Sequence, residues 1–437
     1  MIAAVLGGGA TARFVSLEDE DLPEALHAEL AALAAAGDSP AYHPDIVTAM
    51  ARGGVMERDA QRYGYLVVAE RGGGVLAAAP IVVTSEVLVD LLSGPGLLHR
   101  ACNVVRRFPR LLGVTTMCVG TALDQAGGVL VRPGAARRAA LGRFDEALAW
   151  AARALRCAAV IWKDIATDGE LHRQLLARGY HGFVALPGST LPLARFPSLH
   201  DYLTWLGEVA SGGDLRRKIR NAGYDSPGVR EHLERRGDPA RQLASLRRRA
   251  AAVRAGSQLA APLAFETVRA PTAGQLDQMW RLYDAREARA RFRWTRLSRA
   301  FFARLARLPE ARFSLCRSGE RLLGFSSAVI HGGRFVTLRS GVDLELARRF
   351  SIPVLLVLRD IEAAIDERCA QITLGPTGYE LKARFGVTFT PTVAMTRMLA
   401  PLAAPLTPLV CRAVDTANRR AGIHELHRVD FRSAWGA

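Results

Sequence analysis

The chain has 437 residues, of which 49% are hydrophobic, and its formal net charge is +16. This length exceeds what one simple hydrophobic core accommodates, so two domains are expected. No run of about 20 apolar residues is present, and the first residues lack the basic start and long apolar run of a signal peptide, which predicts a cytoplasmic protein without a membrane span.

The positive charge favours anionic partners such as nucleic acid or phosphorylated ligands. An Arg-rich coding bias is the alternative source of the charge. The six cysteines form no CxxC pair and most lie inside apolar runs, a pattern typical of buried, reduced thiols. Nothing in the sequence indicates an oligomeric state.

The first 198 residues predict a hairpin and two short strands, then a helix, a strand, a short helix and two strands. The hairpin joins Tyr65–Glu70 to Val75–Val83 across the Gly-rich turn 71–74, because short β-prone runs around such a turn pair with each other. The elements that follow it are expected at Met117–Val119, Val129–Val131, Phe144–Leu155, Ala158–Trp162, Gly169–Arg178, Gly182–Leu186 and Ser189–Leu193.

Residues 199–262 differ from the rest because basic side chains are concentrated there. The segment begins with an expected helix, Leu199–Val209, which Ser211, Gly212 and Gly213 end. The basic residues are compatible with a solvated helical face or with an arm that contacts phosphates. The proposed phosphate contacts in it are Arg216, Arg217, Lys218, Arg220, Arg247, Arg248 and Arg249.

Residues 263–400 repeat the order of elements of the first part. The strands Phe313–Arg317, Leu322–Ile330 and Phe335–Arg339 are separated by Gly-containing turns, which predicts an antiparallel meander. Ser351 and Pro353 then favour a helix start. The strand Gln371–Leu374, the short helix Pro376–Phe385 and the strand Thr388–Met398 follow, preceded in the same segment by Leu263–Val268, Thr272–Arg286 and Leu297–Leu305. The repeated order predicts two copies of one α/β unit, followed by a helical tail over 401–437.

Several well-known catalytic signatures are missing from the sequence. It contains no HxxxH or HExxH spacing, so no metal site is expected. It also lacks a GxSxG elbow, a Walker loop and a GxGxxG after a strand. No Ser or Cys is paired with a base, so a covalent nucleophile is not indicated.

The second unit resembles the GNAT N-acyltransferases, and in particular their Fem-type branch, which includes aminoacyl-tRNA-dependent transferases. The resemblance rests on the helix 353–365 and on the motif Y-x-x-K-x-x-F-G, here Tyr379, Lys382, Phe385 and Gly386. It covers 263–398 well and the first half only by the order of elements. It implies an α/β (α+β) fold of two tandem GNAT-like lobes, each a mixed, mostly antiparallel sheet flanked by helices. The expected division is a lobe at 1–198, a basic helical connection at 199–262, a catalytic lobe at 263–400 and a tail at 401–437.

One departure from the family bears on the acyl donor. Acyl-CoA-dependent members hold the pyrophosphate on a Gly-rich loop before the long helix, where backbone N–H groups point at the phosphates. The corresponding residues 346–353 contain no glycine, and Pro353 lacks an N–H. The resemblance, the charge and this departure together favour aminoacyl-tRNA as donor, with no cofactor and with tRNA as partner. Acyl-CoA remains the alternative, since Arg348 and Arg349 could meet a phosphate.

The resemblance also implies roles for individual residues. Lys382 would contact the terminal tRNA phosphate or the developing oxyanion, and Tyr379 would donate to the leaving hydroxyl. Asp343, or alternatively Glu345, would accept the amine proton. The remaining candidates are Arg339 for a carboxylate or phosphate, and Trp162 with Lys163 for the acceptor. Each of these residues also has a structural interpretation as a surface, packed or ion-paired side chain.

The function expected from the sequence is therefore amide formation between an aminoacyl group and an amine. The acceptor would be a peptidoglycan precursor or an amine in specialised metabolism such as antibiotic biosynthesis, which an Arg- and Ala-rich sequence hints at. Besides the acyl-CoA-dependent alternative, a non-catalytic double-GNAT protein that binds RNA is the alternative from another class.

Overall fold

The computed structural model describes residues 2–18, 21–37, 40–53, 62–84, 115–121, 123, 127–209, 212–235, 238–255, 259, 261–289, 296–375, 378–401, 403–420 and 422–423. The chain forms two compact units, each assembled from separate stretches of sequence. Unit 1 contains Met1–Gly188, Arg291–Phe301 and Thr390–Arg428, and unit 2 contains Ser189–Ala290, Phe302–Phe389 and Val429–Ala437. These limits differ from the four consecutive segments expected from the sequence.

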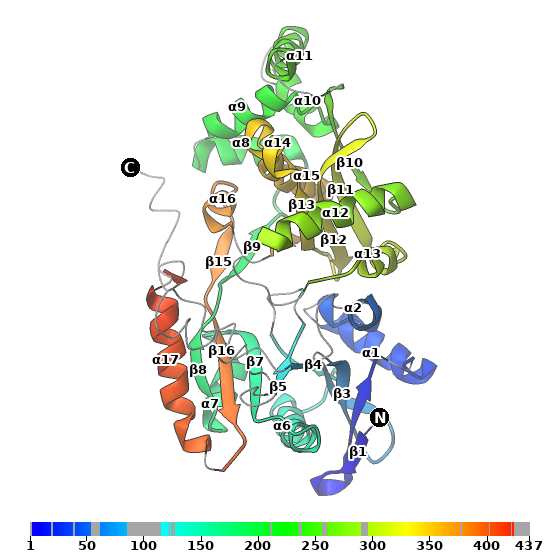
Figure 1. The fold of residues 1–437 in the computed structure, drawn as a ribbon, viewed down its shortest axis with the longest axis vertical. Coiled ribbons are helices and arrows are strands. Elements are labelled where there is room, and N and C mark those ends of the chain that lie inside the picture. Colours follow the sequence, from blue (N-terminus) through cyan, green and yellow to red (C-terminus); the bar gives the residue numbers. More distant parts are fainter. Residues whose placement is uncertain are drawn as a thin grey trace. The chain divides into compact units, whose positions relative to one another are not determined.

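The sheet of unit 1 has the strand order β1-β2-β3-β4-β5-β7-β16-β8, with β6 paired to β4, among the described residues. Strands β1 to β5 pair antiparallel, whereas β5 and β7 pair parallel across the connecting helix α6. The labelled elements can be followed in Figure 1. Their bounds are β1 Ile2–Val5, β2 Thr11–Ser16, α1 Glu24–Ala36, α2 Pro44–Gly53, β3 Arg62–Ala69, β4 Val75–Thr84, β5 Thr116–Val119, β6 Leu130–Val131, α6 Arg137–Ala154, β7 Ala159–Ala166, α7 Glu170–Ala177, β8 His181–Val184, β16 Thr392–Met398 and α17 Thr407–Arg420.

The sheet of unit 2 has the order β10-β11-β12-β13-β14-β9-β15. Strands β10 to β13 form an antiparallel meander, and β13 pairs parallel with β14 across helix α15. The bounds are β9 Gly188–Pro192, α8 Leu199–Val209, α9 Gly212–Ala222, α10 Pro227–Glu234, α11 Pro239–Ala255, β10 Leu263–Val268, α12 Ala273–Arg289, α13 Arg299–Leu305, β11 Ala311–Ser318, β12 Arg321–His331, β13 Arg334–Val342, α14 Leu344–Phe350, α15 Ile352–Asp366, β14 Gln371–Thr373, α16 Tyr379–Ala383 and β15 Thr388–Thr390.

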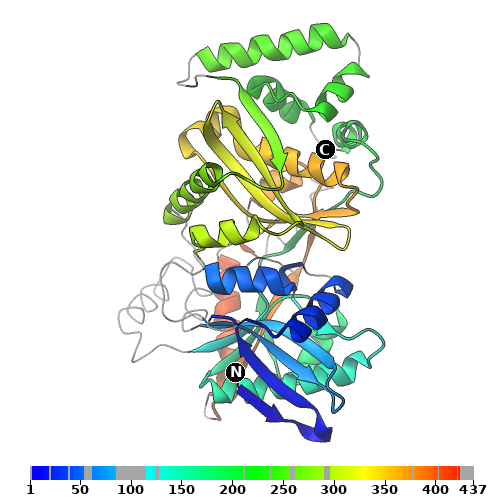
Figure 2. The same ribbon diagram turned by 90° about the vertical axis from the view of Figure 1, so that its right-hand side faces the viewer.

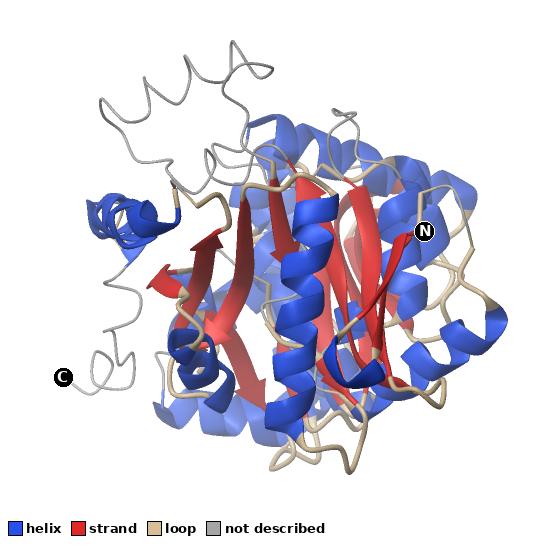
Figure 3. Ribbon diagram, turned by 90° about the horizontal axis from the view of Figure 1, so that it is seen from below, coloured by secondary structure: helices blue, strands red, loops and turns tan. Residues whose placement is uncertain are grey.

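The two units therefore share one plan, as the repeated order of elements predicts. In each unit an antiparallel meander leads into a parallel strand pair that is bridged by a long helix. Figures 2 and 3 show this mixture of sheets and flanking helices from two further directions. Each unit buries its own apolar core, which around α6 of unit 1 includes Phe144 and around α15 of unit 2 includes Ile361.

Each sheet is completed by a strand from a distant part of the sequence. Strand β9 pairs antiparallel with β14 in unit 2, and β16 pairs antiparallel with β7 and β8 in unit 1. The single strand expected over Thr388–Met398 was wrong, because Pro391 separates β15 from β16 and the two strands belong to different sheets. A proline has no N–H for a ladder hydrogen bond, so a strand tends to end at it.

Two short elements were not predicted from the sequence. Gly7–Gly9 forms a 3-10 turn between β1 and β2, which pair over four residues. The stretch before the long helix α15 forms a helix of its own, α14. Of the cysteines, Cys102 lies outside the described residues, and the other five are buried free thiols.

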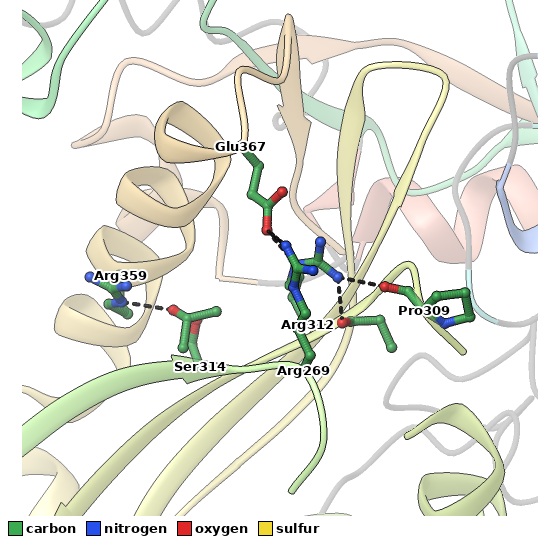
Figure 4. Close-up of polar contacts among 8 residues, drawn as sticks. Arg269, Pro309, Arg312, Ser314, Arg359 and Glu367 are labelled. Carbon is green, nitrogen blue, oxygen red and sulfur yellow. Dashed lines mark hydrogen bonds and ion pairs between the residues drawn. The ribbon is translucent and has the colours of Figure 1, made fainter. Parts of the chain in front are cut away.

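Polar contacts fix α15 on the sheet of unit 2. Arg312 of β11 donates to Glu367, just after α15, at 2.6 Å, and Arg269 approaches the same carboxylate at 3.4 Å. Figure 4 shows both guanidinium groups next to Glu367. On the same helix, Glu362 accepts from the Tyr224 hydroxyl at 2.9 Å and from the Gly228 N–H at 3.0 Å. The α15 helix thus links the sheet to the helices α9 and α10.

Candidate functional site

Strands β13 and β14 separate soon after they begin to pair. Their parallel register runs from Arg334↔Gln371 to Val336↔Thr373. The next residue of β13, Thr337, donates its hydroxyl to the Thr373 carbonyl at 3.2 Å and accepts from the Gly375 N–H at 3.0 Å. The Thr337 side chain therefore occupies the point where the two backbones diverge.

A β-bulge lies beside this point of separation. Ser327 of β12 pairs with Arg339, while the adjacent Ala328 pairs with Thr337, so Leu338 is an extra residue in β13. The Ser327 hydroxyl donates to the Arg339 carbonyl at 2.9 Å. Bulges are common next to active sites because they redirect side chains.

Lys382 lies at the diverging end of β14, with its ammonium group buried. Only 7% of the residue is exposed. Its Nζ donates to the Gly375 carbonyl. The same atom lies 3.4 Å from the hydroxyl of Ser189, the second residue of β9. The Nζ atom is also 5.2 Å from the ring centre of Tyr379, one turn earlier on α16. The lysine expected from the family motif is thus held by neutral oxygen atoms and an aromatic ring.

No carboxylate is among the groups that shift the pKa of Lys382. Burial and, to a smaller extent, the positive charge of Arg286 together lower that pKa to about 7. Burial also lowers the pKa of Arg286, with a smaller effect of the same sign from Arg339. Arg286 lies on α12 and donates to the carbonyl and hydroxyl oxygens of Ser340 on β13, at 2.7 and 2.9 Å. Three basic side chains therefore influence one another at this end of β13.

The other motif residues have clear structural reasons. Phe385 is buried, and its carbonyl accepts from the Tyr202 hydroxyl at 3.1 Å. Gly386 has φ +69°, and a Cβ added there would lie 2.4 Å from Cη2 of Trp205. Only glycine tolerates both the left-handed backbone and this close approach. The motif thus closes α16 against α8 and fixes the position of Lys382.

Tyr379 is packed in the core of unit 2. It is 6% exposed, and its ring meets the ring of Phe389 edge-on at 5.4 Å between centroids. Arg339 is half-buried and donates to the neighbouring Leu338 carbonyl at 3.0 Å. Tyr379 lies on α16 together with Lys382, and Arg339 lies on β13 next to Ser340, which Arg286 contacts. The first two residues of the helix expected over Pro376–Phe385 lie outside the described residues.

Asp343 has a structural role at the end of β13. It caps the N-terminus of α14, where its Oδ1 accepts from the N–H groups of Glu345 and Leu346 at 3.1 and 3.2 Å. Its other oxygen forms an ion pair with Arg321 at 2.7 Å. Glu345 is exposed in the first turn of the same helix. Proton acceptance by either residue stays a prediction, and the Asp343 carboxylate is already engaged by three donors.

The start of α15 offers few donors to a phosphate group. Ser351 joins α14 to α15 in a left-handed conformation with φ 55°, and its side chain makes no cap hydrogen bond. Pro353 has no N–H, and the N–H groups of Val354 and Leu355 both donate to the Ser351 carbonyl, at 3.0 and 3.2 Å. Arg348 and Arg349 are exposed in the last turn of α14.

The basic segment forms helices α9, α10 and α11, which belong to unit 2. On α9, Asp214 pairs with Arg217 at 2.6 Å and with Lys218 at 2.5 Å. The hydrogen bond from Lys218 lowers the pKa of Asp214 most strongly. Arg247 of α11 lies 3.8 Å from Asp225. The exposed residues of the predicted phosphate-binding set are Arg216, Arg217, Arg220, Arg247, Arg248 and Arg249.

The acceptor residues expected in unit 1 occupy different environments. Trp162 is 1% exposed and packs edge-on against Phe144 and Tyr180. Such a side chain has no free surface for a substrate, so the structure gives it a core role instead. Lys163 is also buried and forms an ion pair with Asp164, which has a left-handed φ of 54°.

Sequence reasoning missed Arg286 and Ser189. Arg286 lies three residues after Tyr283, on the helix face that the apolar residues Met279 and Tyr283 bury. A charge that continues an apolar helical face is a signal for a functional or paired residue, and it was available in the sequence. Ser189 carried no local signal, because its contact with Lys382 spans 193 positions.

The described residues contain no group of three or more His, Cys, Asp or Glu side chains placed to hold a metal ion. None of the described helices is long and apolar enough to cross a bilayer.

Comparison with known proteins places residues 240–383 in the family model for the acetyltransferase (GNAT) domain. The structure of FemX is similar with a TM-score of 0.50 at 11% identity, covering 87% of this chain and 98% of that one. L-PGS from Bacillus licheniformis has a TM-score of 0.47 at 11% identity, with 89% and 96% covered. A tandem GNAT protein from the clavulanic acid biosynthesis pathway has 0.45 at 14%, with 89% and 99% covered.

No curated protein sequence matches the chain. At these identities the structural likeness concerns the fold alone. The expected fold class, two tandem GNAT-like lobes with mixed sheets flanked by helices, is confirmed.

Proposed function

We propose that this chain, whose residues 240–383 match the family model for the acetyltransferase (GNAT) domain, is an N-acyltransferase that moves an aminoacyl group from aminoacyl-tRNA to an amine. The observation that carries the proposal is the Lys382 site, where a buried ammonium and two guanidinium groups gather at the separation of β13 and β14. A concentration of positive charge in a poorly solvated place is costly unless an anionic group binds there.

The reaction would be aminolysis of an ester. The amine attacks the carbonyl carbon, negative charge develops on the carbonyl oxygen, and the ribose hydroxyl leaves with a proton. Lys382 would donate to the developing oxyanion or to the adjacent terminal phosphate, with Arg286 and Arg339 as further cations. Donors fixed in a site of low dielectric stabilise such charge more strongly than water does.

The start of α15 supports tRNA over acyl-CoA as donor. Pyrophosphate binding at a helix start needs N–H groups that are free to donate. Here Pro353 lacks one, and Val354 and Leu355 donate to Ser351. The exposed arginines of α9 and α11, including Arg220 and Arg248, are suited to a phosphate backbone. The proposed acceptor is an amine of a peptidoglycan precursor or a specialised metabolite.

Acyl-CoA is the second candidate donor, because the matching family model describes an acetyltransferase. A protein that binds RNA without transfer is the third possibility. The first experiment is a titration of the full chain with bulk tRNA and with acetyl-CoA at several salt concentrations. Affinity for tRNA that falls steeply with salt, without acetyl-CoA binding, supports the proposal. Saturable acetyl-CoA binding with weak tRNA binding would replace tRNA by CoA as donor.

Transfer itself is tested with charged tRNA and a panel of amines, using Lys382→Met. The matched control is Arg384→Met, which removes an exposed cation from the end of the same short helix. We expect the Lys382 variant to lose transfer and the Arg384 variant to keep it. If the unmodified protein binds tRNA but transfers no aminoacyl group under any condition, the RNA-binding alternative is favoured.

A further inference from the structure

Helices α8, α9, α10 and α11 enclose a pocket of about 330 Å³ in unit 2. Its volume lies at the lower end of the range for small-molecule sites, about 300–1,000 Å³. Aliphatic side chains form most of its wall, among them Leu203, Leu206, Leu215, Ile219, Leu233 and Leu246. None of the residues of the Lys382 site lines it, whereas Arg216 and Arg220 of the predicted phosphate-binding set do.

The polar part of the pocket is positively charged. Arg216 and Arg220 line it from successive turns of α9, and both residues are exposed, so they border its open side. His232, Gln242 and Ser245 are the other polar residues of the wall. No Asp or Glu is among the described residues of the wall. A ligand that fits this distribution has an apolar part inside and an anionic group at the arginines.

The wall also discriminates between kinds of apolar ligand. Nucleobases in proteins are held by stacking on Phe, Tyr or Trp, and the described part of the chain places none of these residues in the pocket wall. Branched aliphatic side chains instead pack well around a flexible hydrocarbon chain, because both are apolar and lack a preferred stacking geometry. The phosphate contacts of Arg216 and Arg220 therefore need not belong to RNA.

We propose that this pocket binds a single aliphatic chain with an anionic headgroup, a carboxylate or a phosphate monoester. The chain lies among the leucines, and Arg216 and Arg220 contact the headgroup. Guanidinium groups bind both kinds of headgroup through paired hydrogen bonds.

Leu246 sets the length of the chain that fits. The same side chain lines a second cavity of about 380 Å³, which is bordered by Leu259 and Phe350. Leu246 is 2% exposed and lines both cavities. Its truncation connects them, so Leu246→Ala shifts the preferred ligand towards longer chains.

The test is isothermal titration calorimetry of the full chain with decanoate, decyl phosphate and decyltrimethylammonium, each below its micelle concentration. We expect both anions to bind with one-to-one stoichiometry and the cation at least about tenfold more weakly. The tighter anion identifies the headgroup. Equal binding of the cation and the anions, or no saturable binding of either anion, overturns the proposal.

Variants place the ligand in this pocket. Arg220→Glu should weaken anion binding at least about tenfold, while Arg248→Glu makes the same charge change outside the pocket wall and should not. Leu233→Trp should block the pocket, with Gln242→Trp as a second blocking variant if the first fails to fold by circular dichroism. Undiminished binding in a folded blocking variant contradicts the assignment, as does equal weakening by the two arginine variants.

Discussion

Lys382 Nζ lies 3.4 Å from the hydroxyl of Ser189, although 193 positions separate the two residues in the sequence. The contact exists because β9, which Ser189 belongs to, pairs antiparallel with β14. The strand that completes the sheet of unit 2 thus also supplies a neutral partner for its buried lysine. The position of the candidate catalytic group depends on a long-range strand pairing.

Lys382→Met should abolish transfer and at the same time stabilise the protein near neutral pH. Burial and Arg286 lower the pKa of Lys382 to about 7, which means that the folded protein disfavours the charged form. The free energy of unfolding is therefore not reduced by Lys382 above the unfolded pKa, near 10.4. It decreases as the pH falls from there towards 7, because the unfolded chain then binds a proton that the folded protein does not. Methionine removes that loss. Thermal unfolding at about pH 7 measures the gain. A destabilised, inactive variant would instead indicate a purely structural lysine.

Binding of an anionic ligand to the Lys382 site should take up a proton. An anion next to Nζ favours the ammonium form and raises the pKa of Lys382 from its value of about 7. Uptake is largest near pH 8, where the empty site is mostly neutral, and small near pH 6. Calorimetry in buffers of different ionisation enthalpy counts the protons. Arg384→Met should show the same uptake, and Lys382→Met none.

Gly386→Ala should destabilise unit 2 by about 2 kcal/mol or more, because it adds a clash to an unfavourable φ. The new Cβ would lie 2.4 Å from Trp205, and the backbone φ is +69°. The matched control is Gly274→Ala in the first turn of α12, where a Cβ meets nothing within 4 Å. Urea unfolding of both variants gives the comparison. If the two variants have equal free energies of unfolding, Trp205 of α8 moves away from the new Cβ at little cost.

Asp360→Asn should stabilise the protein above about pH 6 and have little effect near pH 4. Asp360 is 2% exposed, and burial raises its pKa to about 6. Between the unfolded value near 3.9 and 6, the unfolded chain ionises while the folded one stays protonated, so stability falls as pH rises. The loss approaches about 3 kcal/mol above pH 6. Unfolding free energies of Asp360→Asn and of the unmodified protein over this range test it. A parallel pH profile for Asp360→Asn and the unmodified protein contradicts the prediction.

Asp343→Asn distinguishes a structural from a catalytic aspartate. Asparagine also caps helices well, so α14 should persist and transfer should stay near the level of the unmodified protein. Loss of the exposed pair with Arg321 should cost less than about 1 kcal/mol. A drop in transfer of about 100-fold without a change in stability would restore Asp343 as the base.

The sequence predicted those parts of the fold that local patterns determine. The meander β11–β13 follows from Gly turns between apolar runs, and the lysine of the site follows from a motif in which Gly386 has its own backbone reason. The places of β9 in the sheet of unit 2 and of β16 in the sheet of unit 1 were not predictable in this way. The alternation of apolar and polar residues along a strand does not identify the strand with which it pairs. The α14 helix was missed because its cap, Asp343, was assigned to catalysis.

The origin of β16 has a consequence for the order in which the protein can fold during synthesis. Most of unit 1 precedes residue 188, yet the strand between β7 and β8 of its sheet is Thr392–Met398. The N-terminal lobe therefore leaves the ribosome without the strand between β7 and β8. Its sheet stays incomplete until most of unit 2 has been translated. At typical elongation rates of about 5–20 residues per second, this interval lasts about 10 to 40 seconds. We expect this delay to make folding dependent on chaperones and to keep truncated lobes from accumulating, because an unpaired strand edge promotes aggregation.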